Sequence, residues 1–316
     1  MKTMVACGLL VLMLSGGAAA QVSRESFRIR DPFVLADGGK YWLYASVPEA
    51  EGRGVSVRTG EDLENWSEPR TVMTVPTNVA CTAVWAPEVH KYGGAYWMFV
   101  TLTERKGTRP IKPMAEGVEA VRLEPRGTWV FKAVRPDGPF EPVKVEPVTP
   151  AGAMALDGTL YVEDGIPYMV YCHEWCQLGN GTMEYAPLKP GFAALASEPV
   201  RLFDAKSAFP GAGYVTDGPY LYKSVKGGRL YLIWSNFIEG SGNYSVLVRS
   251  SPNGRLAGPW TKDEILYDGD GGHAMVFRTL EGRLMLTLHQ PNVAPNERMR
   301  LYELEDDGEH LRLKRN

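Results

Sequence analysis

The amino-acid sequence predicts an all-β protein, a five-bladed β-propeller with four-stranded blades around a central channel. Three observations predict this fold. A hairpin unit recurs five times, turn-forming residues separate short apolar runs throughout, and a polar residue stands near the start of each predicted inner strand. The 34 glycines and 23 prolines suit many tight turns, and the 15 tyrosines and 10 phenylalanines favour strands over long helices.

The first 20 residues have the pattern of a secretory signal peptide. Lys2 supplies a positive charge, Met4 to Leu14 form an apolar stretch, and Ser15 to Ala20 are the small residues typical of a cleavage site. The apolar stretch is too short to cross a bilayer, and no other run is long enough to do so. We therefore expect residues 21–316 to form a single exported domain, secreted or periplasmic, without a membrane as partner.

Charge and cysteine content narrow the classes of partner. The formal net charge is −3 and the isoelectric point is near 6.0, so no basic field points to nucleic acid or to an anionic membrane surface. Beyond the predicted leader the chain contains Cys81, Cys172 and Cys176, and three cysteines do not make a disulfide framework. We expect core cysteines and a monomer.

The first hairpin unit begins at Arg30-Asp31-Pro32-Phe33. An apolar run follows the charged pair, the turn Asp37-Gly38-Gly39 comes next, and a second apolar run from Tyr41 to Ala45 completes the unit. This pattern predicts two short strands joined by a glycine-rich turn. Asp31 stands at the mouth of the first strand, where an aspartate by itself is a common turn residue.

The same unit returns four times with variations. The later turns are Gly93-Gly94, Glu163-Asp164-Gly165, a turn near Gly227-Gly228, and Glu281-Gly282. As equivalent markers, one for each unit, we take Asp31, Glu88, Asp157, Asp217 and His273, which are 57, 69, 60 and 56 residues apart. Further strand and turn signals lie between the hairpins. Each unit therefore holds about four strands, as a propeller blade does.

A two-sheet sandwich is the alternative that alternating strands also allow. A sandwich has no reason to repeat a polar residue at the start of each innermost strand, whereas the inner strands of a propeller converge on one axial pocket. We also expect the strand from Arg298 to Tyr302 to complete a blade near the N-terminus, which would close the ring and remove its edges.

Three aspartates, Asp31, Asp157 and Asp217, would then meet on one rim of the channel. Carboxylates gathered in one depression repel each other and lose solvation, and such groups often serve chemistry in which one acid stays protonated while another stays ionised. Glycoside hydrolysis needs that arrangement, because an acid protonates the leaving oxygen and a base activates water. Turn capping explains any one aspartate alone better than it explains three at equivalent positions.

Several of these strings resemble glycoside hydrolase family 43, the five-bladed propeller glycosidases that act on arabinose- and xylose-containing glycans. The resemblance spans essentially all of the chain beyond the leader. Arg30-Asp31-Pro32-Phe33 is similar to the first-blade motif of the family, and Trp85-Ala86-Pro87-Glu88 is similar to its second-blade signature. Ala155-Leu156-Asp157-Gly158 occupies the place of the third-blade aspartate, and Gly271-Gly272-His273 resembles the fifth-blade segment.

The resemblance implies a role for each aspartate. Asp31 would be the general base, and Asp157 would orient the general acid and tune its pKa. The fourth-blade segment of the family usually carries glutamate before Gly-Pro, but here the one-methylene-shorter Asp217 precedes Gly218 and Pro219. Glu174, a longer carboxylate, lies at the end of a predicted third-blade strand. The general acid is therefore Asp217 by position or Glu174 by chemistry, unless Glu174 is a salt-bridged structural residue near the pocket.

Four more residues are candidates for contact with substrate or metal. The indole rings of Trp85 and Trp175 can stack on sugar rings, although both also suit packing within the blades. Gln290 ends the fifth hairpin, where its amide can hydrogen-bond sugar hydroxyls. By the resemblance, His273 lies on the propeller axis, often near a bound calcium or a water. The expected reaction requires no cofactor, and the metal ion to consider is a structural calcium on the propeller axis.

The sequence therefore predicts an inverting glycoside hydrolase for arabinose- or xylose-containing plant polysaccharides or oligosaccharides, of the α-L-arabinofuranosidase or β-xylosidase kind. Asp31 would deprotonate water while Asp217 or Glu174 protonates the leaving group. Two alternatives stay open. One is a β-galactosidase- or galactanase-like member of the same family, and the other is a propeller that binds glycan without cleaving it.

Overall fold

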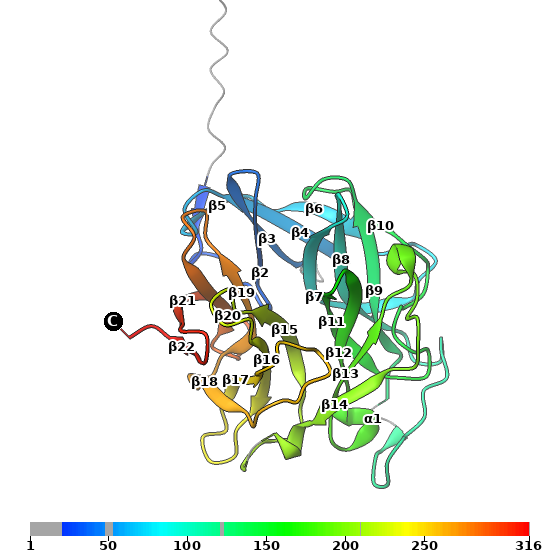
Figure 1. The fold of residues 1–316 in the computed structure, drawn as a ribbon. Coiled ribbons are helices and arrows are strands. Elements are labelled where there is room, and N and C mark those ends of the chain that lie inside the picture. Colours follow the sequence, from blue (N-terminus) through cyan, green and yellow to red (C-terminus); the bar gives the residue numbers. More distant parts are fainter. Residues whose placement is uncertain (1–20, 48–52, 121–122, 209, 316) are drawn as a thin grey trace, which may run out of the picture.

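Five antiparallel sheets surround a central axis in chain order (Figure 1), which confirms the predicted all-β five-bladed propeller. The computed structural model describes residues 21–47, 53–120, 123–208 and 210–315, and the predicted leader lies outside these residues. Four of the sheets have four strands and the first has six. Within the described part of the chain, no helix is both long and apolar enough to span a membrane.

The innermost strands of neighbouring blades contact one another around the axis. From the axis outward, the first blade consists of β2 (Phe33–Asp37), β3 (Lys40–Ser46), β4 (Gly54–Gly60) and β6 (Arg70–Thr74). Two more strands, β5 (Asn65–Ser67) and β1 (Gln21–Ser23), extend this sheet beside β4. The second blade consists of β7 (Cys81–Tyr92), β8 (Ala95–Glu104), β9 (Arg126–Ala133) and β10 (Glu141–Pro142).

The remaining three blades repeat the four-stranded pattern. Their strands are β11 (Ala155–Glu163), β12 (Ile166–His173), β13 (Thr182–Pro187) and β14 (Val200–Asp204), then β15 (Asp217–Lys223), β16 (Leu230–Phe237), β17 (Tyr244–Ser251) and β18 (Glu264–Tyr267), and last β19 (Gly272–Arg278), β20 (Leu284–Gln290), β21 (Arg298–Asp306) and β22 (Leu311–Leu313). The short helix α1 (Trp175–Leu178) follows β12, and 3₁₀ turns lie at Pro190–Phe192 and Ala205–Ser207.

The first three predicted hairpin turns form as two-residue loops, whereas the turns near Gly227 and Gly282 are longer. Asp37 pairs with Lys40 and Tyr92 pairs with Ala95, which leaves two glycines at each tip, all four with positive φ. Loops of this kind match the right-handed twist of the strands and favour residues without a Cβ. Gly-Gly at these two positions therefore ends one strand and starts the next in the expected register.

Apolar side chains pack between neighbouring sheets. One buried cluster joins the first and second blades, and others join the second to the third, the third to the fourth and the fourth to the fifth. Trp66, Trp129 and Trp234 are almost fully buried. The three cysteines of the described chain form no disulfide. This rigid core holds the inner strands at fixed positions around the axis.

The strand near Arg298 does not complete a blade close to the N-terminus, so that prediction is wrong. β21 pairs with β20 and β22 inside the fifth blade, and β1 pairs with β5 at the outer side of the first blade. A short connection between β20 and β21 favours pairing of sequential strands. An ion pair and a backbone hydrogen bond join the first and last blades instead: Arg300 pairs with Glu25, and the backbone N–H of Ile29 donates to the backbone carbonyl of Glu297.

The backbone at the start of the inner strands shows which residues are equivalent between the blades, and two of the five marker residues, Glu88 and Asp217, are not. In the four later blades the pairing register shifts near the start of the inner strand, as at a β-bulge. One residue at each kink, or at the mouth of the first inner strand, has positive φ: Asp31 (50°), Ala86 (45°), Asp157 (53°), Gly218 (50°) and His273 (51°). These five residues are the equivalent positions. Glu88 lies two residues after its position, and Asp217 lies one residue before.

Candidate active site

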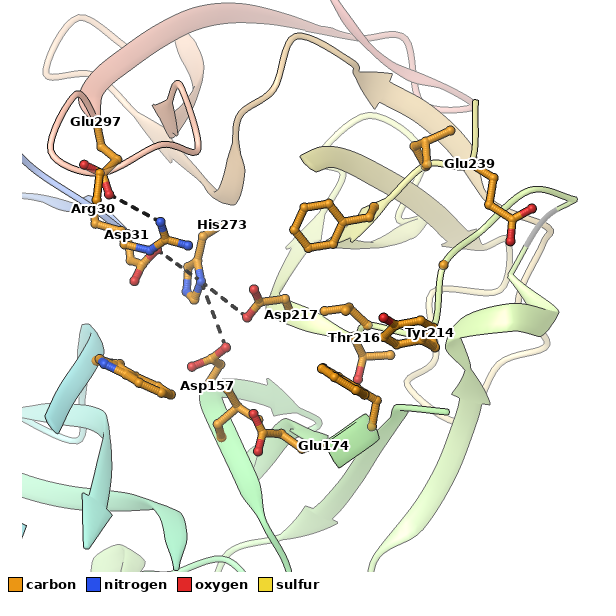
Figure 2. A pocket seen from close by; sticks show the side chains of 18 of the residues that line it. Arg30, Asp31, Asp157, Glu174, Tyr214, Thr216, Asp217, Glu239, His273 and Glu297 are labelled. Carbon is orange, nitrogen blue, oxygen red and sulfur yellow. Dashed lines mark hydrogen bonds and ion pairs between the residues drawn. The ribbon is translucent and has the colours of Figure 1, made fainter. Parts of the chain in front are cut away.

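A cavity of about 750 Å³ opens at the end of the channel where the inner strands begin (Figure 2). It gathers seven of the eight side chains that sequence analysis singled out. These are Asp31, Asp157, Asp217, Glu174, Trp85, Trp175 and His273. Other lining residues include Arg28, Arg30, Tyr214, Phe237, Glu239 and Glu297.

Gln290 is the residue that the fold does not bring to the cavity. Its amide donates to the carbonyl of Gly269 at 2.7 Å, and its carbonyl accepts from the hydroxyl of Tyr302 at 3.3 Å. Both halves of the amide are therefore occupied within the fifth blade, and Gln290 is not among the described residues that line the cavity.

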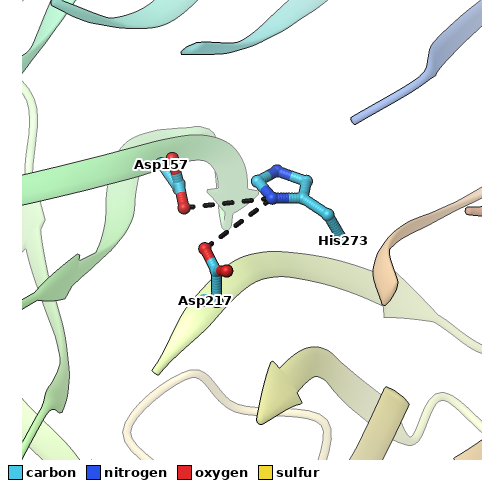
Figure 3. A group of neighbouring side chains, drawn as sticks. All are labelled: Asp157, Asp217 and His273. Carbon is cyan, nitrogen blue, oxygen red and sulfur yellow. Dashed lines mark ion pairs between the residues drawn. The ribbon is translucent and has the colours of Figure 1, made fainter. Parts of the chain in front are cut away.

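The three aspartates meet around one histidine ring (Figure 2), and Figure 3 shows two of them, Asp157 and Asp217, beside that ring. His273 Nδ1 lies 3.5 Å from Asp31 Oδ1, 3.7 Å from Asp217 Oδ1 and 4.0 Å from Asp157 Oδ2. The imidazole ring rests against Gly218, where an added Cβ would come within 2.9 Å of the ring. Non-glycine residues hold the same positive φ at the other four equivalent positions, so the contact with the ring is what requires glycine here. Gly218 therefore lets the histidine reach all three carboxylates.

Positive groups surround Asp31. Besides His273, His289 Nδ1 lies 3.2 Å from Asp31 Oδ1, and Arg30 Nε lies 3.8 Å from the same oxygen. Burial by itself would raise the pKa of Asp31, but the two histidines and Arg30 together hold that pKa well below its ordinary value. Asp31 is therefore ionised at any pH at which the fold is expected to persist.

Asp157 has the opposite environment. It is buried, and burial together with the nearby carboxylates of Asp217 and Asp31 raises the pKa of Asp157 well above its ordinary value. The hydroxyl of Thr101 and the N–H of Gly218 lie 3.2 and 3.3 Å from its two oxygens. Asp157 thus retains a proton where Asp31 does not, so neighbouring carboxyl groups are held in different protonation states.

Tyr244 is a contact of Asp217 that sequence analysis missed. Its hydroxyl donates to Asp217 Oδ2 at 2.6 Å, and its ring stacks on His289 with centroids 5.8 Å apart. Burial and the adjacent carboxylate raise the pKa of Tyr244 well above its ordinary value, so the hydroxyl stays a donor. Tyr244 begins the third strand of its blade, and no local pattern links that position to the inner strand.

Glu174 is salt-bridged. Arg126 Nη1 lies 2.6 Å from Glu174 Oε1, and the guanidinium also stacks under the indole of Trp85, 4.1 Å from the ring centroid. Burial raises the pKa of Glu174 even though Arg126 opposes that shift. Arg126 holds Glu174 and Trp85 at one wall of the cavity, which agrees with a structural role for Glu174. Sequence analysis did not single out Arg126, because a basic residue in a strand is usually a surface residue.

Partly exposed aromatic rings line the cavity at several points. Trp85 is 38% exposed, Tyr214 is 43% exposed and Phe237 is 40% exposed, which is unusual for such large apolar side chains. Trp175 packs against Tyr214 with ring centroids 4.6 Å apart. Aromatic faces at a polar cavity are suited to stacking on the C–H faces of sugars.

Asp157, Asp217 and His273 can also be considered as a metal site, since one ligand atom from each lies within 4.8 Å of the others (Figure 3). Calcium usually takes six to eight oxygen ligands. These residues offer two carboxylates and one imidazole nitrogen, so an ion held by them would take most of its ligands from water. The group can hold a metal ion, but as a calcium cage it is incomplete.

Fold and site together define a five-bladed propeller that gathers carboxylates at one end of its channel, as propeller glycosidases do. The family model described as glycosyl hydrolases family 43 matches residues 25–315. A solved structure titled as an endo-arabinase from Bacteroides thetaiotaomicron superposes with a TM-score of 0.79 at 30% identity, over 92% of this chain and 99% of that chain. The chain belongs to glycosyl hydrolases family 43.

Curated relatives are more distant. An extracellular exo-α-(1→5)-L-arabinofuranosidase of Streptomyces chartreusis is 24% identical over 72% of this chain and 66% of its own length. An extracellular endo-α-(1→5)-L-arabinanase of Bacillus subtilis is 21% identical over 59% of this chain and 56% of its own length. The chain thus spans between about half and two thirds of the curated relatives it matches.

Proposed function

We propose that this protein is an inverting glycoside hydrolase that cleaves α-linked L-arabinofuranose units in arabinose-containing polysaccharides or oligosaccharides. The observation that carries the reaction is the contrast between Asp31, held ionised, and Asp157, which retains a proton beside Asp217. An ionised base and a proton-bearing acid group in one cavity are what glycoside hydrolysis needs. The sugar is proposed from the names of the relatives, which are arabinanases and arabinofuranosidases.

Asp31 acts as the general base in the proposed mechanism. Its carboxylate takes a proton from the water that attacks the anomeric carbon, while His273, His289 and Arg30 keep the carboxylate ionised between turnovers. Inversion follows because water attacks the anomeric carbon directly, on the face opposite the leaving group.

Asp217 acts as the general acid, and Asp157 positions it and maintains its proton supply. Asp217 is one methylene shorter than glutamate, but Tyr244 and His273 fix it from two sides, with its second oxygen facing His273. Glu174 is the less suitable acid because Arg126 occupies one of its oxygens and the other is enclosed without a hydrogen-bond partner. The acid must carry its proton at the working pH, and the buried carboxyl of Asp157 beside it retains one.

Substrate hydrolysis tests the proposal. Purified protein should release nitrophenol from the α-L-arabinofuranoside or cut linear α-1,5-arabinan, with much lower rates on the β-xyloside and the β-galactoside. Proton NMR at early times should show the inverted anomer of the released sugar first. Preference for a xyloside or galactoside would contradict the proposed sugar specificity, and retention of the anomeric configuration would contradict the inverting mechanism. Binding of arabinan without turnover would identify a glycan-binding propeller.

We propose that the reaction needs no metal at Asp157, Asp217 and His273. A calcium ion held there would supply positive charge that favours ionised carboxylates, which conflicts with the proton that the acid must carry. Exhaustive treatment with a chelator should leave kcat/KM unchanged within about twofold, since no step depends on an ion. Loss of activity that calcium restores would contradict this proposal.

We further propose that the protein is exported as a monomer. The curated relatives from Streptomyces chartreusis and Bacillus subtilis are named extracellular, and a soluble polysaccharide substrate is reached outside the cytoplasm. N-terminal sequencing of the exported protein should begin near Gln21, and light scattering should give the mass of one chain. Retention of residues 1–20 on the mature protein would contradict the proposed export, and the mass of a dimer would contradict the proposed monomer.

A further inference from the structure

A second cavity adjoins the first. It has a volume of about 340 Å³, and two aromatic side chains, Trp175 and Tyr214, line both cavities. The segment between β8 and β9 supplies Glu116, Val118 and Glu119 to its opposite wall. The two cavities therefore share the Trp175–Tyr214 pair as a wall, and a sugar chain that extends from the first cavity past this pair would reach the second.

The aromatic pair is held in place by the residues around it. Gln177 of α1 is buried, its carbonyl oxygen accepts from the N–H of Met154 at 2.7 Å, and its amide nitrogen donates to the carbonyls of Lys112 and Gly152. These bonds tie α1, and with it Trp175, to the segment between β8 and β9 that supplies the opposite wall and to the residues just before β11. Rigid aromatic walls reduce the entropy that is lost when a ligand binds.

The lining chemistry of the second cavity suits a neutral carbohydrate. Two rings offer apolar faces, and the carboxylates of Glu116 and Glu119 are acceptors for hydroxyl hydrogen bonds. None of the described residues that line this cavity is basic. A uronic acid or another anionic sugar would therefore meet like charges, whereas a neutral sugar would not.

The second cavity lies on the side of the general acid. Tyr214 precedes Asp217 by three residues, and Figure 2 shows Asp217 between Asp31 and Tyr214. The general acid protonates the leaving group, so sugar units beyond Asp217 belong to the leaving-group part of the substrate. We propose that the second cavity binds a unit of a neutral oligosaccharide on the leaving-group side of the cleaved bond. This inference rests on the proposed function, because Asp217 assigns the side.

The proposal predicts that longer leaving groups are cleaved better. The kcat/KM of the wild type should rise at least tenfold from nitrophenyl arabinofuranoside, which has no leaving-group sugars, to linear arabino-oligosaccharides of four to six units. Val118→Trp, which fills the second cavity, should lower the ratio of oligosaccharide to aryl glycoside kcat/KM about tenfold. The matched control is Val134→Trp at a site that is 81% exposed, and this variant should leave the ratio unchanged.

A binding experiment separates this proposal from the proposed function. Calorimetry on the Asp31→Asn variant should show arabinohexaose binding at least tenfold tighter than arabinobiose, and adding Val118→Trp should remove the difference. Equal ratios for Val118→Trp and the wild type would overturn the second site and leave the hydrolase assignment intact. Absence of turnover with preserved length-dependent binding would overturn the hydrolase assignment, and with it the leaving-group side, but would leave the second binding site in place. Binding of an oligogalacturonide as tight as that of arabinohexaose would overturn the neutral-ligand inference.

Discussion

Individual side chains set the protonation states on which the proposed chemistry depends. Asp31 and Asp157 occupy equivalent positions in their blades, with the same unusual backbone conformation. Asp31 faces two histidines and an arginine, while Asp157 is enclosed and faces carboxylates. One backbone geometry therefore presents two aspartates with opposite acid–base character, because the neighbours and not the backbone determine the pKa.

Asp31→Asn removes the proposed base without altering shape or volume. We expect kcat to fall by about 10²–10⁴-fold, the range that general-base catalysis contributes. Binding of arabino-oligosaccharides should change little, since the stacking rings are untouched. Steady-state kinetics together with calorimetry check both statements. An Asp31→Asn protein with wild-type kcat would remove Asp31 from the mechanism.

Asp157→Asn should change both the pH profile and the stability. Burial holds the folded-state pKa of Asp157 above its unfolded value, so its contribution to stability is complete below about pH 4 and is lost as pH rises. Asparagine carries no charge, so we expect the variant to gain on the order of 1–2 kcal/mol of unfolding free energy at pH 7 and little at pH 3. Denaturant unfolding at the two pH values measures this gain.

Asp157→Asn should also shift the alkaline limb of the pH profile of activity. Asparagine removes the carboxyl group whose pKa is raised, so the pair of acids no longer retains a proton to as high a pH. The alkaline limb of kcat/KM should therefore shift to lower pH, and the rate at neutral pH should fall by roughly 10–100-fold. An unchanged alkaline limb would show that Asp157 does not tune the acid.

Strands and helices bring these side chains together through a small number of repeated features. A residue with positive φ recurs at the start of every inner strand or at the kink within it, and α1 contributes Trp175 to both cavities. His173 at the end of β12 supports α1, since its two ring nitrogens lie 3.2 Å from Glu184 Oε1 and 2.9 Å from Gln177 Oε1. Both partners are acceptors, so a doubly protonated imidazole satisfies both contacts.

The His173 network predicts a pH-dependent support for α1. Burial by itself would lower the pKa of His173, but Glu184, Gln177 and the nearby Glu174 raise it above its unfolded value. The stabilisation is therefore complete below about pH 6.5 and is lost as pH rises through the folded-state pKa, with a total on the order of 1 kcal/mol. In thermal unfolding measured from pH 6 to 9, the wild type should lose this stabilisation as pH rises, whereas His173→Asn should not. Parallel curves for the two proteins would contradict the prediction.

At the scale of the whole molecule, the ring is closed by side chains rather than by a shared strand. The carboxylate of Glu297 is fully buried and binds Arg28 through both oxygens at 2.9 and 3.1 Å, and Arg30 at 3.4 Å. Glu297 precedes β21, whereas both arginines precede β2, so these contacts join the last blade to the first. The same arginines line the active-site cavity, which couples ring closure to the site.

Glu297→Gln should weaken the closed ring. Two guanidinium groups would lose their charged partner, and we expect a loss of about 1–3 kcal/mol of unfolding free energy at pH 7. The arginines hold the pKa of Glu297 below its ordinary value despite burial, so its stabilisation is present above about pH 4.5 and is lost as pH falls. The exposed Glu305→Gln in the same blade is the control and should change stability by less than about 0.5 kcal/mol. Equal stabilities would show that Glu297 does not close the ring.

Much of this architecture follows from local pattern. Five hairpins with glycine turns, the aromatic composition and the polar residues at the strand mouths were sufficient to predict the propeller and the meeting of Asp31, Asp157 and Asp217, because turn chemistry and alternation act over a few residues. The resemblance to the family and the chemistry of the side chains added the other nominated residues. Only the tertiary structure revealed that Asp217 lies one residue before the kink, that Tyr244 holds it, that Arg126 binds Glu174, and that Gln290 is directed elsewhere. These contacts join residues far apart in sequence, and bulge register and side-chain packing decide them, neither of which leaves a local pattern.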